Sequence, residues 1–457
     1  MRIAPYGMAL ERVLYPAWEA IRGRPSYAIL AQLQRSERAS LDQLEAMRAG
    51  LLRRLARHAY AHSAHYRTTF DAAGVDPERI RAVADVQRLP LLTRTTAQAS
   101  VDLRTADWPR AAFAKPTSGS TGEPLVVRYS TESRLWRDAT RWRGFGWAGY
   151  RMGQKAVHIW GVPAAAPRGL QRLKVNVDHV LRRDVYVSCL VRSPAQLRLM
   201  VDTIRRERPD VLLGYAQAVA DLARFVLREG LRDWDAIPVV IGAERLWGHD
   251  RADIVAAFGP AVFETYGCRE FMLMGSECEA HDGFHESAEN LIVETVVREG
   301  DGSVRPAAPG EQGEVAVTDL HNLACPFIRY LTGDLAVARA PAPCACGRSL
   351  PRFGPVAGRV TETLHDVDGN PVDGIVFAIL FGDLNKHTRQ FQVVQRKDRS
   401  VVVRIVPKSP GPLAPAVEAL MRAFIGTHLR GVPLDFLVVD QIRLTRAGKL
   451  QRVVVER

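Results

Sequence analysis

The chain has 457 residues, of which 47% are hydrophobic and 25% charged, and its formal net charge is +12. This composition excludes a disordered chain and a small domain that depends on disulfides, because a large core can form. The basic residues are distributed through the whole chain instead of forming a tail or stripe. We therefore expect the basic residues to promote solubility and to attract anionic nucleotides. The net charge is the only feature that would support nucleic-acid binding, and we do not expect such binding.

The amino-terminal segment lacks the apolar core of a signal peptide, and no apolar run approaches the roughly 20 residues that span a bilayer. The chain has six cysteines, which is few for its length and fits a reducing compartment. We expect a cytoplasmic protein with no membrane partner. In such a protein, clustered cysteines suggest a metal site before a disulfide.

Residues 8–75 are predicted to form helices, because apolar residues recur there at spacings of three and four, and Ser40 and Asp42 are start signals. From about residue 111, short β-branched runs alternate with helical segments. The runs are PLVVRYS, KAVHIWG, VLLGY, IPVVIGAE and AVFETYG. This alternation predicts a layered α/β fold with parallel strands.

After residue 290 the predicted strands follow one another more closely, with turn sequences such as REGDGS between them. We predict an α/β protein: a large N-terminal domain of layered, mostly parallel sheets with helices plus a β-rich subdomain, and a small, mobile α+β C-terminal domain. Residues 1–110 would be the helical N-terminal segment of the large domain. Residues 111–358 would be its core, β-rich from about 290, and residues 359–457 the C-terminal lid domain.

A loop of small residues stands out in PTSGSTGEPLVVRYS, residues 116–130. Such a loop presents backbone N–H groups and short hydroxyls at close range, which suits phosphate oxygens. It is not the nucleotide P-loop motif, because the lysine of that motif is absent. A flexible surface hairpin is the alternative for this stretch taken alone, since Gly and Ser are common turn residues.

Six motifs in order resemble those of the adenylate-forming (acyl-CoA synthetase-like) superfamily. They are TSGSTGEP at 117–124, GAE at 242–244, TYGCRE at 265–270, RYLTGD at 329–334, GR at 358–359 and GKLQR at 448–452. The helical entry segment around HAYAHSAHYRTTF and the sequence CACGR resemble the phenylacetate–CoA ligase-like branch, including its capsule-biosynthesis-associated relatives. The resemblance covers nearly the whole chain.

The resemblance implies an AMP-forming acid–thiol ligase. Such an enzyme joins a carboxylic acid to ATP as an acyl-adenylate, releases pyrophosphate, and passes the acyl group to an acceptor, most often the thiol of coenzyme A. Catalysis would rest on positioning and on electrostatic stabilisation of the charge that builds on the phosphates. The implied cofactors are ATP/AMP, Mg²⁺ and coenzyme A, and a homodimer is one possible assembly.

The resemblance also implies the phosphate-binding and catalytic residues. The small-residue loop would bind the β- and γ-phosphates through Thr117, Ser118, Gly119, Ser120, Thr121 and Gly122. Glu270 would bind Mg²⁺, a hard cation that prefers oxygen ligands. Lys449 would reach the α-phosphate and the carboxylate as a mobile charge. Thr121, Glu270 and Lys449 are thus the expected catalytic residues.

The remaining motif residues would hold the nucleoside. The adenine would lie against Gly242, Ala243, Glu244, Tyr266 and Gly267. Asp334 would accept hydrogen bonds from both ribose hydroxyls, and Arg359 would contact ribose or phosphate. Taken singly, each of these residues has an ordinary alternative, such as a core aromatic, a strand end or a turn.

A second group of residues predicts a structural metal site. Cys278, His285, Cys344 and Cys346 match the Cys₃His donor set of structural zinc sites, in which every ligand comes from protein. Similar Cys and His positions in phenylacetate–CoA ligase-like relatives are associated with zinc. The alternative is a pair of buried thiols and an exposed, unpaired pair.

The sequence departs from the family after the GR motif, where Thr361 and Glu362 replace two aspartates. This departure leaves an amine, an alcohol or a carrier-protein thiol open as the acceptor. A second hypothesis is a nucleotide-binding scaffold without turnover. The retention of Glu270, Asp334 and Lys449 argues against it. The acid itself is not specified, although Trp160 and Val162 would favour an apolar or aromatic one.

Overall fold

The structure is a computed structural model. It describes residues 5–21, 26–109, 113–116, 125–161, 179, 182–190, 192–300, 303–359, 363–369, 371–373, 377, 387–409, 411–444 and 450–456. The predicted loop residues 117–122, Val162, Thr361, Glu362 and Lys449 lie outside this part of the chain. Among the described helices, none is long and apolar enough to cross a membrane.

The N-terminal third of the large domain is helical, as predicted. Its elements are α1 (Pro5–Ala9), η1 (Leu10–Leu14), α2 (Tyr15–Ile21), α3 (Ser26–Ser36), α4 (Leu41–His62), α5 (Ala64–Ala72), η2 (Pro77–Arg79), η3 (Val83–Arg88), α6 (Arg94–Ala99) and α7 (Val101–Arg104). Ser40 caps α4, because its hydroxyl accepts from the Gln43 amide while the Gln43 side chain accepts from the Ser40 amide. The helix start predicted at Ser40 is therefore confirmed.

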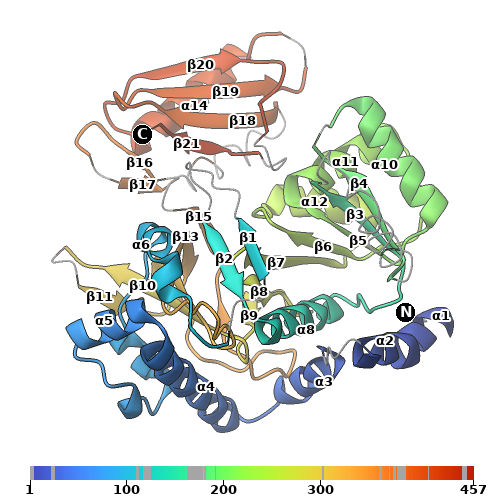
Figure 1. Cartoon of the computed structure of the whole chain (residues 1–457). Coiled ribbons are helices and arrows are strands. Elements are labelled where there is room, and N and C mark those ends of the chain that lie inside the picture. Colours follow the sequence, from blue (N-terminus) through green and yellow to red (C-terminus); the bar gives the residue numbers. More distant parts are fainter. Residues whose placement is uncertain are drawn as a thin grey trace.

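An eight-stranded sheet forms the centre of the large domain, in the order β14-β9-β8-β7-β6-β5-β3-β4. The strands are β3 (Ala156–Trp160), β4 (Asp184–Ser188), β5 (Val211–Tyr215), β6 (Val239–Gly242), β7 (Val262–Cys268), β8 (Met272–Ser276), β9 (Phe284–Glu286) and β14 (Arg352–Phe353). The half from β4 to β7 is parallel, and α10 (Pro194–Glu207), α11 (Ala216–Arg228) and α12 (Gly248–Phe258) pack on it (Figure 1).

The β-rich subdomain is an antiparallel sheet of five strands, in the order β11-β10-β12-β13-β15. The strands are β10 (Leu291–Arg298), β11 (Val304–Pro306), β12 (Gln312–Asp319), β13 (Tyr330–Val337) and β15 (Val356–Arg359). Leu52 and Leu55 of α4 pack against Ile292 and Ile328 of this subdomain. The helical segment therefore shares a core with the sheet that carries the predicted RYLTGD motif.

The small-residue loop connects two antiparallel strands, β1 (Phe113–Pro116) and β2 (Val126–Tyr129), which form a sheet of their own. Leu125 and Val127 join the core formed by Phe271 and Val317. The next helix, α8 (Thr131–Trp147), runs beneath the centre of the molecule and lies against β8 at Gly144 (Figure 1). The chain on both sides of the loop, at Pro116 and Leu125, is thus anchored by strand pairing and by the core.

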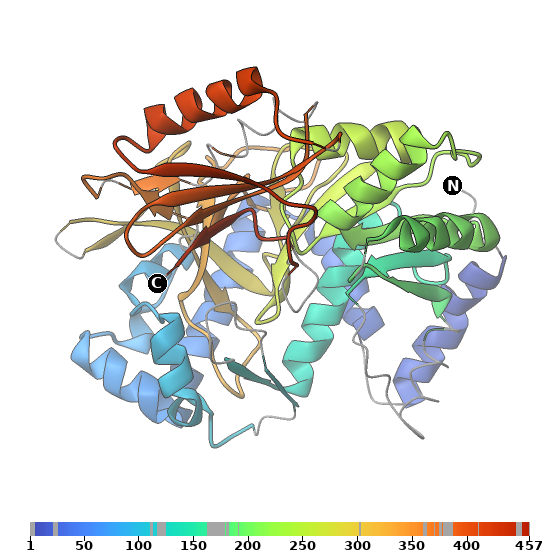
Figure 2. The ribbon, with the colours of Figure 1, turned by 90° about the horizontal axis from the view of Figure 1, so that it is seen from above.

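The C-terminal domain has its own core and lies across the middle of the larger part (Figure 2). Its main sheet has the order β20-β19-β18-β21. Its elements are β16 (Thr363–His365), β17 (Pro371–Asp373), β18 (Thr388–Gln395), β19 (Val401–Pro407), α14 (Pro415–His428), β20 (Leu434–Val438) and β21 (Val453–Val455). Met421 and Ile425 of α14 pack on Val403 and Ile405 of β19.

The predicted fold class is confirmed, with a large α/β N-terminal domain and a smaller α+β C-terminal domain. Two details differ from the expectation. PLVVRYS contributes β2 of the separate hairpin and not a strand of the central sheet. The central sheet is parallel only up to β7, because residues 269–271 between β7 and β8 are too few for the crossover that a parallel partner requires.

Gly267 occupies an irregular position in the β7–β8 hairpin, where the register shifts between Tyr266 and Gly267. A Cβ atom at Gly267 would overlap the backbone carbonyl oxygen of Met272. Backbone atoms cannot move aside as a flexible side chain can. The glycine that follows the tyrosine in TYGCRE is therefore required by the close approach of the two strands.

Replacing Gly267 with alanine should lower the free energy of unfolding of the large domain by about 1–3 kcal/mol, the usual cost of overpacking. Gly50 in α4 is the matched control, because nothing lies within 4 Å of its added Cβ atom. Gly50→Ala should stabilise the helix by about 0.5–1 kcal/mol. Denaturant unfolding measures both changes, and equal effects of the two substitutions would contradict the packing argument.

Candidate functional site

The structure brings together Tyr266 and Asp334, which are 68 residues apart in the chain. The Tyr266 hydroxyl donates a hydrogen bond of 2.7 Å to Oδ2 of Asp334. Tyr266 lies at the end of β7 and Asp334 in β13, so this bond connects the eight-stranded and five-stranded sheets. Burial and then the Asp334 carboxylate raise the pKa of Tyr266 well above its usual value. The hydroxyl therefore remains a donor at neutral pH.

Glu270 lies beside these two residues, on the turn between β7 and β8, and is only 8% exposed. Arg94, at the start of α6, places Nη1 3.6 Å from Oε1 of Glu270. Cys268 lies between the two acidic residues: burial, and then the carboxylates of Glu270 and Asp334, raise the pKa of its thiol well above the usual range. Tyr266, Cys268, Glu270 and Asp334 thus form one cluster where the two sheets meet.

The GAE motif lies at the end of β6, next to β7 in the sheet. Gly242 closes the strand, and Ala243 adopts a left-handed φ of 67°. Glu244 then accepts two backbone hydrogen bonds, from the Gln217 amide at 3.0 Å and from the Leu450 amide at 3.3 Å. Leu450 belongs to the GKLQR motif. The second and the last of the six motifs are therefore in direct contact.

For Arg359, the structure describes the backbone: it pairs with Asp334 in the β13–β15 register.

Of the residues expected to border the acid, Trp160 belongs to the described part of the chain. Trp160 ends β3 and lies against Tyr215 at the end of β5, with the ring centroids 4.4 Å apart. A Cβ atom added at Gly242, the last residue of β6, would lie 3.6 Å from Cη2 of the Trp160 indole. An aromatic wall therefore borders the end of β6.

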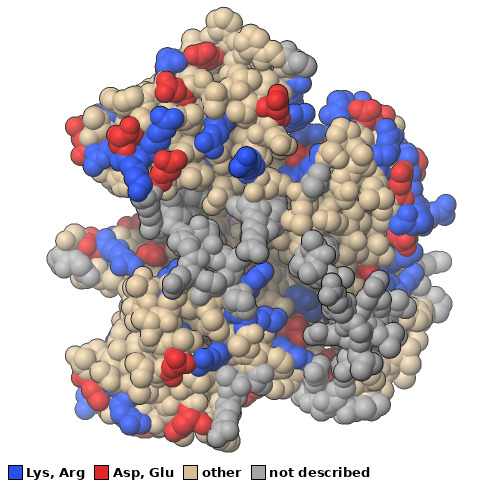
Figure 3. Space-filling view, turned by 45° about the horizontal axis from the view of Figure 1, so that its top comes forward, with Lys and Arg blue, Asp and Glu red and all other residues tan. Residues whose placement is uncertain are grey.

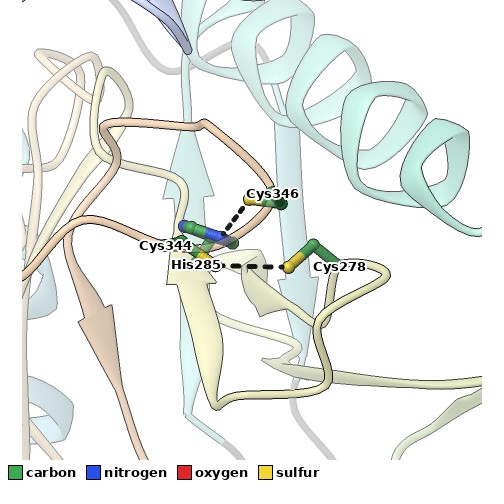
Figure 4. Close-up of side chains that lie close together, drawn as sticks. All are labelled: Cys278, His285, Cys344 and Cys346. Carbon is green, nitrogen blue, oxygen red and sulfur yellow. Dashed lines mark hydrogen bonds between the residues drawn. The ribbon is translucent and has the colours of Figure 1, made fainter.

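The four predicted metal ligands converge (Figure 4). Their ligand atoms all lie within 4.8 Å of one another. The sulfurs of Cys278 and Cys344 are 3.7 Å apart, and Cys346 Sγ is 3.3 Å from His285 Nε2. Two thiolates on a tetrahedral zinc, at about 2.3 Å each, are about 3.8 Å apart. The donor set and its spacing therefore fit zinc.

The ring of His285 is oriented for such a site. Its Nδ1 atom hydrogen-bonds the carbonyl oxygen of Leu350 at 3.2 Å, which leaves Nε2 directed at the sulfur atoms. Second partners of this kind are typical of metal-binding histidines. The cluster joins β9, which carries His285, to the loop before β14, and these two strands pair in the central sheet. It is thus placed as a structural link.

Three residues of these sites were not singled out from the sequence: Arg94, Cys268 and Gln217. Arg94 was read only as part of the helical entry segment, and Cys268 only as one of the cysteines. The role of Arg94 depends on contact with Glu270, 176 residues later in the chain, and that of Cys268 on its proximity to Asp334, 66 residues later. For Cys268 alone a local signal existed, since it lies inside the TYGCRE motif.

Glu264, near the start of β7, lies in an environment that changes the pKa of its carboxyl group. Burial raises its pKa to about 7, assisted by the neighbouring carboxylate of Glu277 and opposed by the Leu246 amide, which donates to it at 3.1 Å. The folded protein therefore holds this proton more tightly than the unfolded chain does. The associated stability is present at low pH and is lost as the pH rises through about 7.

Glu264→Gln should remove this pH dependence, because the amide oxygen can still accept from Leu246 and carries no charge. As the pH rises from about 5 to about 8.5, the free energy of unfolding of the variant should increase by about 1–3 kcal/mol relative to that of the wild type. Urea unfolding at the two pH values measures this difference. Glu229→Gln, at an exposed carboxylate after α11, is the control and should show no such gain. A Glu264→Gln variant whose stability falls with pH as steeply as that of the wild type would refute the assignment.

Several curated proteins are similar to this chain. It is 29% identical to a phenylacetate-coenzyme A ligase of Aromatoleum evansii over 458 residues, which covers 93% of this chain and 97% of that protein. It is 27% identical to the phenylacetate-coenzyme A ligase of Thermus thermophilus over 380 residues, covering 78% and 79% of the two chains. The Escherichia coli protein of the same name is 29% identical, covering 72% and 74%. No family model matches the chain.

Solved structures agree on the fold. A crystal structure of 2-hydroxyisobutyryl-CoA ligase in the postadenylation state with 2-HIB-AMP gives a TM-score of 0.71 at 18% identity, covering 93% of this chain and 92% of that one. The same ligase in the thioesterification state, with 2-HIB-AMP and CoA, gives 0.59 at 18% identity and the same coverage. Over most of its length the chain is therefore similar in sequence to phenylacetate-coenzyme A ligases, and it shares the fold of 2-hydroxyisobutyryl-CoA ligase, as the six motifs led us to expect.

Proposed function

We propose that this protein activates a carboxylic acid with ATP, forming an acyl-adenylate and releasing pyrophosphate, and then transfers the acyl group to the thiol of coenzyme A. The observation that carries this proposal is the convergence of Tyr266, Cys268, Glu270 and Asp334 where the two sheets of the large domain meet. All four residues lie in the motifs, and contacts with ATP or its Mg²⁺ were expected for three of them, Tyr266, Glu270 and Asp334. The likeness to phenylacetate-coenzyme A ligases supports the choice of reaction.

In the first step, a carboxylate oxygen would attack the α-phosphorus of ATP, and the bond from that phosphorus to the pyrophosphate oxygen would break. Asp334 would hold the ribose hydroxyls; a carboxylate has about four acceptor positions, so it can do so while keeping the hydrogen bond from Tyr266. The 117–122 loop would bind the β- and γ-phosphates. Lys449 would neutralise charge as it develops on the α-phosphate.

Magnesium fits the position of Glu270. Its carboxylate offers oxygen ligands on a buried turn. When bound there, Mg²⁺ would supply charge neutralisation to the phosphates. The guanidinium of Arg94, 3.6 Å from the same carboxylate, would hold Glu270 in place and add positive charge on this side of the nucleotide.

Coenzyme A is the acceptor we favour over an amine, an alcohol or a carrier-protein thiol. The curated relatives are named as coenzyme A ligases, and the match extends over most of each chain. The acid would lie near the end of β6, against Trp160 and Tyr215. This aromatic wall favours an apolar or aromatic acid.

An exchange assay tests the first step. With a suitable aryl or alkyl acid, the protein should incorporate labelled pyrophosphate into ATP. Lys449→Ala should lose this exchange by roughly 100-fold or more while its ATP affinity changes only a few-fold, because the lysine acts mainly as charge develops in the transition state.

Lys397→Ala is the matched control for Lys449→Ala, since Lys397 is an exposed lysine of the same domain. It should exchange at the wild-type rate. A protein that binds ATP but shows no exchange with any acid of a broad panel would instead be a nucleotide-binding scaffold. Adenylation followed by transfer to another acceptor, with no coenzyme A thioester formed, would leave the first step standing and refute the second.

We also propose that Cys278, His285, Cys344 and Cys346 hold one structural zinc ion. All four ligands come from protein, so no position remains for water or substrate, and the ion would stabilise the fold without taking part in the reaction. The site would tie the loop before β14 to β9.

Elemental analysis of the purified protein should find about one zinc per chain. Cys344→Ser should lose the metal and lower the melting temperature, because metal binding contributes to folding. Cys189→Ser alters a buried thiol outside the cluster and should keep the metal. Less than about 0.2 zinc per wild-type chain would exclude a site that supports folding.

A further inference from the structure

One arginine of the C-terminal domain reaches into the large domain. Nη2 of Arg452 lies 3.2 Å from Oδ2 of Asp250 on α12 and also donates to the side-chain oxygen of Gln217 on α11. Its guanidinium lies between two rings, 5.5 Å from the centroid of Trp247 in the large domain and 5.2 Å from that of Phe391 in β18. The side chain is 15% exposed, so the contact is largely shielded from water.

The backbone of Arg452 is fixed within its own domain. Its carbonyl oxygen accepts from the Val393 amide at 2.7 Å, and the next residues form β21 beside β18. The backbone that carries the guanidinium is therefore held at a defined position in the C-terminal sheet. Figure 3 shows Lys and Arg side chains along the furrow where this domain meets the lobe of α10, α11 and α12.

The receiving carboxylate is held independently of Arg452. Asp250 is 1% exposed and also pairs with Arg224, whose Nη1 lies 2.9 Å from Oδ1. Arg224 in turn pairs with Asp221 at 2.8 Å and Asp253 at 3.1 Å. If Arg452 withdraws, Asp250 keeps a charged partner, and the large cost of an unpaired buried charge does not arise. The contact can therefore open without damage to the large domain.

The same contact is connected to the candidate nucleotide site. Leu450, two residues before Arg452, donates its amide to Oε1 of Glu244, and the amide of Gln217 donates to Oε2 of that carboxylate. Gln217 thus touches Arg452 through its side chain and Glu244 through its backbone. A small, open crevice lined by residues of both domains lies beside these contacts. The described polar contacts of Arg452 and Leu450 therefore lie at the edge of this crevice, where the two domains meet.

We propose that Arg452 is a positioning residue that latches the C-terminal domain onto Asp250, and so brings the segment containing Lys449 to the Glu244 end of β6 for the adenylate-forming step. The inference rests on the proposed function for its kinetic consequence, but the latch itself is a property of the substrate-free protein. We take acyl transfer to use another orientation of this domain, since the fold matches 2-hydroxyisobutyryl-CoA ligase with a TM-score of 0.71 in the postadenylation state and 0.59 in the thioesterification state. Arg452 therefore acts on the first step through Lys449 and does not touch substrate.

The kinetic test separates the two steps. Arg452→Gln should reduce pyrophosphate exchange by roughly 10- to 100-fold, the range expected when the docked orientation loses hydrogen bonds made by a charged group. Thioester formation from preformed acyl-adenylate should change less than about threefold. Arg452→Lys should recover part of the exchange, because it keeps the charge without the planar guanidinium. Equal losses in both steps would overturn the proposal.

The matched control is Arg443→Gln, since Arg443 is an exposed arginine that precedes the GKLQR motif in the same domain. It should leave both steps unchanged. If Arg443→Gln lowers exchange as much as Arg452→Gln, the effect belongs to overall charge and the latch is refuted.

A second measurement does not depend on activity. In the substrate-free protein, hydrogen exchange at the Leu450 amide should be roughly 10-fold faster in Arg452→Gln than in the wild type, while the amides of Val453–Val455 stay protected in the folded sheet. Unchanged protection of Leu450 would refute the latch even in an active enzyme. If the wild type shows no pyrophosphate exchange but Leu450 is deprotected as expected, the proposed function fails and the latch stands.

Discussion

The hydrogen bond between Tyr266 and Asp334 fixes the two sheets of the large domain relative to each other at the point where the candidate site lies. Both residues are largely shielded from water, so separation of the sheets would leave a buried hydroxyl and a buried carboxylate without their partner. The turn with Glu270 and the strand with Asp334 are thereby held at a defined spacing. The roles proposed for Glu270 and Asp334 depend on that spacing.

The C-terminal domain is held in a different way. It has its own apolar core, and its described polar contacts with the large domain centre on Arg452 and Leu450. A unit that is internally stable but docked through a few polar contacts can change orientation at little cost. In the proposed function these two parts have different roles: the cluster between the sheets would define where the nucleotide lies, and the C-terminal domain would bring Lys449 to it.

Much of the fold was predictable because it follows from local patterns. The period of apolar residues and the Ser40 cap located α4, and β-branched runs located β3, β5, β6 and β7. The antiparallel half of the central sheet was not predicted, because the turn sequence CREF contains no glycine, proline or asparagine to indicate a hairpin. The motifs located Tyr266 and Asp334, whereas Arg94 and Asp250 act through contacts that arise only when distant segments pack together.

The central claim is that one ATP molecule lies between the β7–β8 turn and β13. A crystal structure with Mg²⁺ and a non-hydrolysable ATP analogue tests it most directly. We predict that the ribose hydroxyls lie within hydrogen-bonding distance of Asp334, with the triphosphate directed toward Glu270 and the loop after β1. A nucleotide bound elsewhere, with the Tyr266–Asp334 cluster unchanged and empty, would contradict the account.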